Sequence, residues 1–228
     1  MTAPSWHEPV ATARREAERS LSRGLAVRPT LVAFEGDEPT LYVRSRLVWD
    51  HFVDRDLVCR ELVALPALLG QSRLLVVSPG RLTDPSVDDP VLADALADRA
   101  VTVDVAERDD QGGLATSGYV LPYTLGDDGH PTWDAPIHLP DGGPWAATVA
   151  QVLMGGCHLD DDGRLGAAGF AYALSRRGMV IAVAPDWRTR YELDRPVNPR
   201  LVRTEDRRRA QRYASRRRHP TTAAGGSR

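Results

Sequence analysis

Residues 58–80 read VCRELVALPALLGQSRLLVVSPG, and this stretch decides the fold class. Its first half carries a helical stripe that is closed by Gly70 and contains Pro66, which should kink or split the helix. The apolar residues of the stripe are Val58, Leu62, Leu65 and Leu69. Its second half, residues 74–77, is a short apolar run ended by Pro79-Gly80, the pattern of a buried strand. A helix that leads straight into a buried strand indicates an α/β protein.

The sequence on either side continues this alternation. Apolar residues at helical spacing predict helices over 10–21, 54–69, 91–98, 145–154 and 167–174, and residues 145–154 could also be part strand. Short apolar or alternating runs predict strands over 30–34, 40–47, 74–77, 100–106, 119–125, 132–139 and 179–184. Two hairpins are expected, around Gly36-Asp37 and around Asp128-Gly129. We therefore predict a mixed sheet with hairpins, covered by helices on both faces in a three-layer α/β/α arrangement.

The order of elements over roughly the first 110 residues, α-ββ-α-β-α-β, resembles that of the deaminase-like and JAB-type folds. The zinc ligands of those enzymes have no counterpart in this sequence. It contains no His-x-Glu paired with Cys-x-x-Cys, and no His-x-His followed by a ligand Asp. The resemblance therefore implies a shared topology without the zinc chemistry.

Charged residues divide the chain into two parts. Residues 1–200 contain 20 Arg and 29 Asp or Glu, a net charge of −9, whereas residues 201–228 contain 9 Arg and 2 acids, a net charge of +7. We predict a single acidic α/β domain over 1–200 and an arginine-rich, largely disordered tail over 201–228. All 29 basic residues are arginine, which excludes enzymes that depend on a Schiff-base or P-loop lysine.

The sequence has no feature of an exported or membrane protein. Residues 1–28 carry charges throughout and lack the apolar core of a signal peptide. The longest apolar runs are far shorter than the roughly 20 residues that a membrane-spanning helix needs. Two cysteines, Cys59 and Cys157, are too few for a disulfide framework and fit a reducing compartment. We expect a cytoplasmic protein with no membrane partner.

The tail is the most distinctive candidate site. A planar guanidinium can donate two parallel hydrogen bonds to one phosphate, and arginine-rich segments can fold on RNA. We predict weak, salt-sensitive and sequence-independent contact with RNA or DNA. The residues expected to make it are Arg207, Arg208, Arg209, Arg212, Arg216, Arg217 and Arg218. The alternative is a solvated or self-associating tail that rests on the acidic body.

A glycine-rich segment before the last predicted helix is a second candidate. Together with Asp186 after the following strand, it superficially resembles a dinucleotide-binding fingerprint. Its glycines are Gly163, Gly166 and Gly169. Leu165 stands where the fingerprint requires its second glycine, so we interpret the glycines as allowing a tight helix entry and close packing. We expect no cofactor.

Metal-binding and nucleophilic residues give a third candidate. Three ligand types share even spacing, which would place them on one side of a strand: His130, Asp134 and His138. Pro131 and Pro136 interrupt that strand, so we interpret the histidines as surface groups and expect no metal. Cys59 falls within a predicted amphipathic helix, where a buried, inert thiol is expected.

These features favour a non-enzymatic accessory or regulatory protein. Its acidic body would engage a protein partner, and its basic tail would tether nucleic acid. The alternative is an enzyme of unrecognised type, a hydrolase or a nucleotide-dependent enzyme. That enzyme would use the Asp/His cluster or the segment 163–186.

Overall fold

The computed structural model of the chain describes residues 6–46, 52–82, 86, 98–108, 111–154, 166–204 and 207. Its helices are α1 (His7–Leu21), α2 (Phe52–Leu68), α4 (Ala146–Met154), α5 (Gly166–Arg176) and α6 (Pro185–Arg190). Its strands are β1 (Thr30–Glu35), β2 (Glu38–Ser45), β3 (Arg73–Leu82), β4 (Asp98–Arg108), β5 (Leu114–Leu125), β6 (Pro131–Trp133), β7 (Ile137–Leu139) and β8 (Met179–Val183). Residues 199–204 and residue 207 are also helical. No helix of these ranges is long and apolar enough to cross a membrane.

The eight strands of the described residues form one sheet in which every pair of neighbours runs antiparallel. Their order is β6-β5-β4-β3-β1-β2-β8, and β7 also pairs with β5. The α/β class is confirmed, and the predicted mixed sheet is wrong. β3, which follows α2, pairs with β1 and not with β2. β8, which follows α5, pairs with β2. Both strands arrive antiparallel to their neighbours, because a helix between two strands does not by itself set their direction.

Most predicted elements are found, several of them longer than expected. The helix over 10–21 is α1, the first hairpin is β1–β2, and the helix that contains Pro66 is α2. The strands β3 and β4 extend to 10 and 11 residues, since they pair with each other along their whole length. Asp98, expected at the end of a helix, instead begins β4. The remaining residues of that predicted helix, 91–97, lie outside the described ranges.

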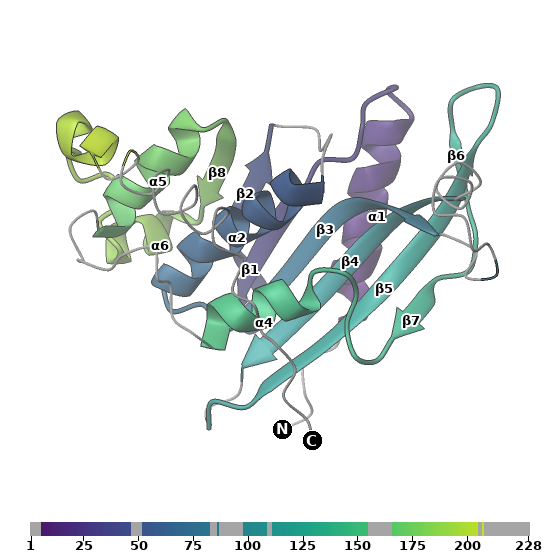
Figure 1. Cartoon of the computed structure of the whole chain (residues 1–228), viewed down its shortest axis with the longest axis horizontal. Helices are drawn as coiled ribbons and strands as arrows, with labels where there is room; N and C mark the ends of the chain where they lie inside the picture. Colours follow the sequence, from purple (N-terminus) through teal and green to yellow (C-terminus); the bar gives the residue numbers. More distant parts are fainter. Residues whose placement is uncertain are drawn as a thin grey trace, which may run out of the picture.

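Side chains that alternate along the strands build a hydrophobic core on each face of the sheet. On β3, Leu74 and Val76 join the core that α2, α4 and α5 cover, whereas Leu75 and Val77 join the core that α1 covers. Figure 1 shows α1 behind the sheet and α2, α4 and α5 in front of it. Full burial of a Leu or Val side chain contributes roughly 1.5–3 kcal/mol, so both groups of helices are held mainly by this apolar contact.

A buried arginine ties the first helix to the sheet. Arg73, at the start of β3, is 3 % exposed, and its guanidinium lies 4.3 Å from the ring centroid of Trp6, the residue before α1. The same guanidinium pairs with Asp37 in the β1–β2 turn at 2.8 Å. Trp6 also packs edge-on against Phe34, with 5.9 Å between ring centroids. The cation–π and ion-pair contacts therefore fix the N-terminal end of α1 over the first hairpin.

We expect Arg73→Met to lower the free energy of unfolding by roughly 1–3 kcal/mol, because it removes the charged hydrogen bond to Asp37 and the contact with Trp6. Asp37 is 78 % exposed and stays hydrated, which limits the loss. The matched control is Arg19→Met, which breaks an exposed pair with Glu16 and should change stability by less than about 0.5 kcal/mol. Urea unfolding followed by tryptophan fluorescence measures both. Equal losses in the two variants would contradict the anchoring role.

Candidate functional site

A polar cluster lies inside the molecule, between the sheet and the start of α4. Ser78 on β3 and Thr102 on β4 are cross-strand partners, and their hydroxyl oxygens lie 2.6 Å apart. The indole Nε1 of Trp145 donates a hydrogen bond to Ser78 Oγ over 2.8 Å. None of these three side chains is more than 7 % exposed. Such partners are required at this depth, because an unpaired buried polar group costs about 1–3 kcal/mol.

Asp104 follows on the same face of β4 as Thr102 and is 2 % exposed. Its Oδ1 accepts a hydrogen bond from the backbone N–H of Gly143 at 2.6 Å, while Oδ2 is buried without a hydrogen-bond partner. Burial raises the pKa of the Asp104 carboxyl to about 6, and the backbone N–H groups of Gly143, Trp145 and Ala146 oppose that rise. The carboxyl therefore changes charge near pH 6 rather than near its ordinary pKa of 3.8.

Two glycines allow the chain before α4 to approach Asp104 this closely. A Cβ on Gly118 of β5 would lie 2.4 Å from the backbone nitrogen of Gly143. A Cβ on Gly143 would lie 2.7 Å from Asp104 Oδ1. Both separations are shorter than atoms tolerate, so the contact between this segment, β4 and β5 requires glycine at positions 118 and 143.

Chemically, the cluster can exchange one proton and can anchor α4. Its members are almost completely buried, and the cavity described below has none of them in its wall. A substrate could reach Asp104 only if α4 or the segment before it moved away. We therefore interpret the cluster as a structural contact that holds α4 on the sheet.

The residues of this cluster carry little signal in the sequence. Thr102 and Asp104 alternate with buried valines, a pattern typical of a strand with one side facing water. One signal does exist. The segment Gly142-Gly143-Pro144-Trp145 leads into α4 without a Ser, Thr, Asp or Asn cap. Asp104 accepts a hydrogen bond from the backbone N–H of Gly143, three residues before the helix, and so holds the segment that leads into α4.

A cavity of about 380 Å³ lies at the N-terminal end of α5. Its wall is formed by residues 166–169 of that helix and by side chains of the segment 191–202. Among the described residues of the wall, the charged ones are Glu192 and Arg195, and they pair with each other at 3.3 Å. The opening is therefore lined by groups that largely satisfy one another.

The glycine-rich segment does not form a dinucleotide-binding unit in the described residues. Gly166 and Gly169 line the cavity, but Asp186 lies in the first turn of α6 and is not in its wall. The strand that follows α5 runs antiparallel to β2, whereas a dinucleotide site needs parallel strands. Gly169 is buried in α5, consistent with the close packing expected for it. Gly163 and Leu165 lie outside the described residues.

The three candidate metal ligands are not brought together. The Nδ1 of His130 lies 3.1 Å from Ser22 Oγ, and the ring of His138 packs against Tyr119 with 5.0 Å between centroids. Asp134 is exposed in the segment between β6 and β7. Within the ranges that the structure describes, no group of three His, Cys, Asp or Glu side chains could hold a metal ion.

Only one of the two cysteines lies within the described residues. Cys59 is fully buried in α2, so the expectation of a buried thiol is confirmed. Cys157, with its neighbour His158, lies outside the described residues.

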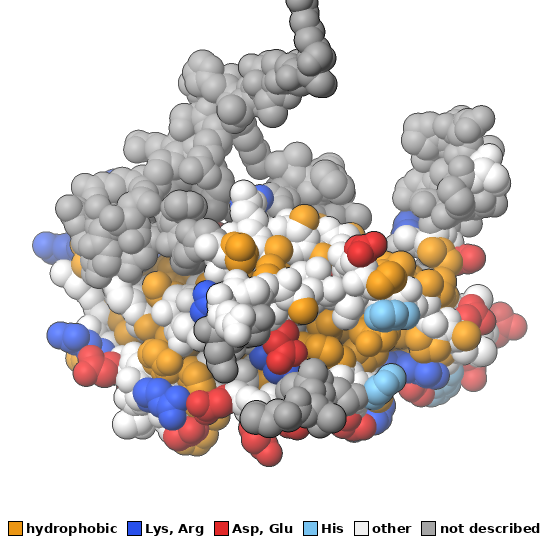
Figure 2. Space-filling model, turned by 90° about the horizontal axis from the view of Figure 1, so that it is seen from below, with side chains coloured by type: hydrophobic (Ala, Val, Ile, Leu, Met, Phe, Trp, Pro, Cys, Tyr) orange, Lys and Arg blue, Asp and Glu red, His pale blue; other side chains and the backbone are white. Residues whose placement is uncertain are grey.

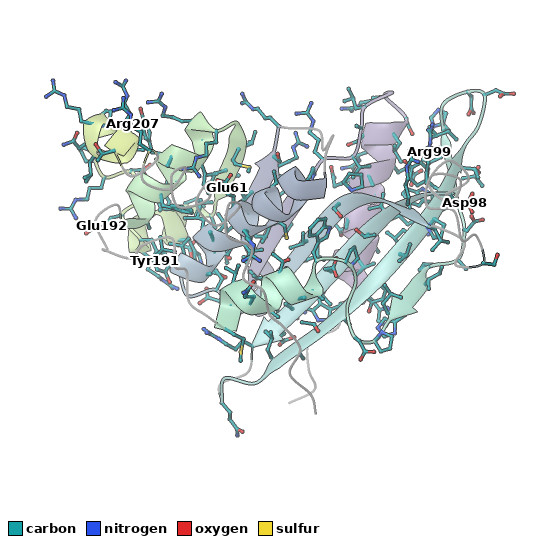
Figure 3. The ribbon with its side chains drawn as sticks, in the orientation of Figure 1. Glu61, Asp98, Arg99, Tyr191, Glu192 and Arg207 are labelled. Atoms are coloured by element: carbon teal, nitrogen blue, oxygen red, sulfur yellow. The ribbon has the colours of Figure 1, made fainter. Side chains whose placement is uncertain are left out.

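The first residues of the arginine-rich tail are packed against the body. Val202, in the helical residues 199–204, is fully buried and lines the cavity beside α5, whereas Arg200 and Arg203 are exposed. Arg207 is helical and exposed, and Figure 3 shows it at the end of the molecule opposite Asp98. The other six arginines predicted to bind nucleic acid lie outside the described residues: Arg208, Arg209, Arg212, Arg216, Arg217 and Arg218.

Comparison of the chain with protein-family models, curated proteins and solved structures finds no match. The topological resemblance to the deaminase-like and JAB-type folds therefore gains no support.

The Asp104 carboxyl should make the protein less stable as pH rises from about 4 to about 7. Its pKa is about 6 in the folded chain and 3.8 without the fold, so between these values the folded state binds more protons and stability falls with rising pH. The full difference corresponds to roughly 3 kcal/mol. Asp104→Asn removes this titration, so the variant should gain roughly 3 kcal/mol relative to the wild type over that pH range in urea unfolding.

The matched control for this pH experiment is Asp134→Asn, at an exposed position, which should follow the wild-type pH profile. A constant stability difference between Asp104→Asn and the wild type from acid to neutral pH would show that Asp104 does not titrate as its burial predicts.

Gly118→Ala should destabilise the protein by roughly 1–3 kcal/mol, because the added methyl group forces the backbone at Gly143 away from β5. The neighbouring Ser117→Ala on the same strand removes an atom rather than adding one, and it serves as the control. Thermal unfolding at constant pH measures both variants. A Gly118→Ala protein that melts with Ser117→Ala would mean that the segment before α4 can shift without cost.

Proposed function

We propose that this protein is a non-enzymatic accessory or regulatory protein, whose acidic body engages a protein partner and whose arginine-rich tail tethers nucleic acid. The observation that carries the proposal is the charge split, −9 over residues 1–200 against +7 over residues 201–228. A polyanion is repelled by such a body and attracted by such a tail. In this proposal the body is a three-layer α/β/α unit, and the tail leaves it from one end.

The charges of the body support this division. On α1, Arg15 and Arg19 pair with Glu8 and Glu16, and the Arg15 guanidinium lowers the pKa of Glu8. On the face shown in Figure 2, acidic and basic side chains lie interspersed around the margin and do not gather into a basic patch. Arginines that are neutralised by neighbouring acids offer little charge to a nucleic acid, which leaves that role to the tail.

The acidic excess also favours a particular kind of protein partner. Complementary charge speeds association and orients it, so a partner with a basic surface fits this body best. Exposed apolar side chains such as Met154 (63 % exposed) and Tyr172 (37 % exposed) would add contact area that such a partner could bury.

The enzyme alternative has less support. The cavity beside α5 is the observation that favours it, but the charged residues of its wall are paired with each other. The histidines and aspartates that the alternative requires lie elsewhere on the surface.

The tail is tested by replacing its seven predicted arginines with glutamine in the full-length chain. Truncation at residue 200 is less informative, since it would also remove the buried Val202. Binding of fluorescein-labelled rU20 and dT20 is followed by anisotropy over a sodium chloride series. Seven phosphate contacts to a single strand predict a slope of log K against log salt of about −5 for the wild type. The glutamine variant should lose nearly all of that slope.

The matched control replaces the same seven residues with lysine, which keeps the charge and should keep most of the slope. Wild-type binding that does not weaken with salt, or a glutamine variant that binds as the wild type does, would overturn the tail assignment.

A further inference from the structure

Beyond the seven arginines predicted for the tail, we infer that the helical residues 199–204, where the body joins the tail, supply the first phosphate contacts of the nucleic-acid site, through Arg200 and Arg203. This inference rests on the proposed function, because it adds residues to the same site. In the helical residues 199–204, positions 200 and 203 lie one turn apart on the same side. Val202 does not share that side and is fully buried. The two guanidinium groups are therefore carried by a turn that is anchored in the body.

The charges of the segment before this turn are neutralised by ion pairs. Three arginines from α6 and the residues after it pair with acids at 2.9–3.3 Å: Arg188 with Asp194, Arg190 with Glu35, and Arg195 with Glu192. Arg200 and Arg203 are exposed, and among the described residues no carboxylate lies within 4.0 Å of either. They thus carry two positive charges that no described carboxylate pairs.

Phosphodiesters are the ligand class that this arrangement suits. Residues three apart on a helix are separated by about 4.5 Å along its axis, so the two guanidinium groups can each donate to a phosphate of one strand. The helical and exposed Arg207 continues the same series toward the tail. Since the turn is already ordered by Val202, its arginines bind without the ordering cost that a free segment bears. The site would therefore begin on the body, at the end of the molecule opposite Asp98 in Figure 3.

The test is Arg200→Gln/Arg203→Gln in the full-length chain, measured with fluorescein-labelled rU20 and dT20 over a sodium chloride series. Loss of two contacts to a single strand should make the slope of log K against log salt shallower by about 1.4, which is about 25-fold weaker binding at 0.1 M salt. The matched control is Arg23→Gln/Arg44→Gln, two exposed body arginines with the same change in net charge. Circular dichroism melting checks that both variants stay folded, and Arg200→Lys/Arg203→Lys should retain the slope.

The outcomes separate this inference from the proposed function. If the seven-arginine glutamine variant of the tail loses binding while Arg200→Gln/Arg203→Gln keeps the wild-type slope, the tail proposal stands and the inference fails. If the Arg23/Arg44 control weakens binding equally, only net charge matters and the inference also fails. If the wild type binds neither oligonucleotide, both proposals fall.

Discussion

The position of α4 depends on a carboxylate that has almost no access to water. α4 begins after two glycines, a proline and Trp145, a segment without Ser, Thr, Asp or Asn. Asp104 on β4 accepts a hydrogen bond from Gly143, three residues before the helix. Burying this carboxyl is unfavourable, as its raised pKa shows, and the backbone N–H groups at the start of α4 offset part of that cost. Moving the segment away would break this hydrogen bond and leave the buried carboxyl and the backbone N–H of Gly143 without partners.

The same strand also holds the other end of α4. The Nη1 of Arg108 donates a hydrogen bond to the carbonyl oxygen of Leu153 at 3.4 Å. Four residues of strand, from Asp104 to Arg108, span about 13 Å. The residues of α4 from Ala146 to Leu153 span about 11 Å, and the long Arg108 side chain reaches the last turn of the helix. β4 therefore fixes α4 at both ends, and the apolar side chains between them, such as Val149, pack into the core shared with α2.

The elements of this fold could be predicted from local sequence, but their arrangement could not. Helical spacing identified α1, and the apolar run after Gly70 identified β3, because both signals lie within a few neighbouring residues. The direction of β3 and β8 depends on which strand each one pairs with, a choice made by residues far apart in the chain. A preference for parallel strands after helices therefore gave the wrong sheet.

The same limit applies to the candidate sites. Asp104 was not identified because its partners are backbone amides about forty residues away, which no residue pattern records. The charge split could be read directly from composition, and the glycines of the tight contact could be read only as turn residues. The point where the tail attaches to the body could not be predicted, because the burial of Val202 depends on α5.

The charge split and the point where the tail attaches together limit where a bound polyanion can lie. Repulsion from the acidic body reaches about 8–10 Å at physiological ionic strength. A strand held only by distant tail residues could remain outside that range, whereas a strand held by Arg200 lies within it. Such a contact is favourable only where the body is locally neutral. The ion pairs of Glu35, Glu192 and Asp194 with arginines create that condition at the end of the body where the tail begins. The pairing of these acids is therefore as important to the proposed site as the arginines left unpaired.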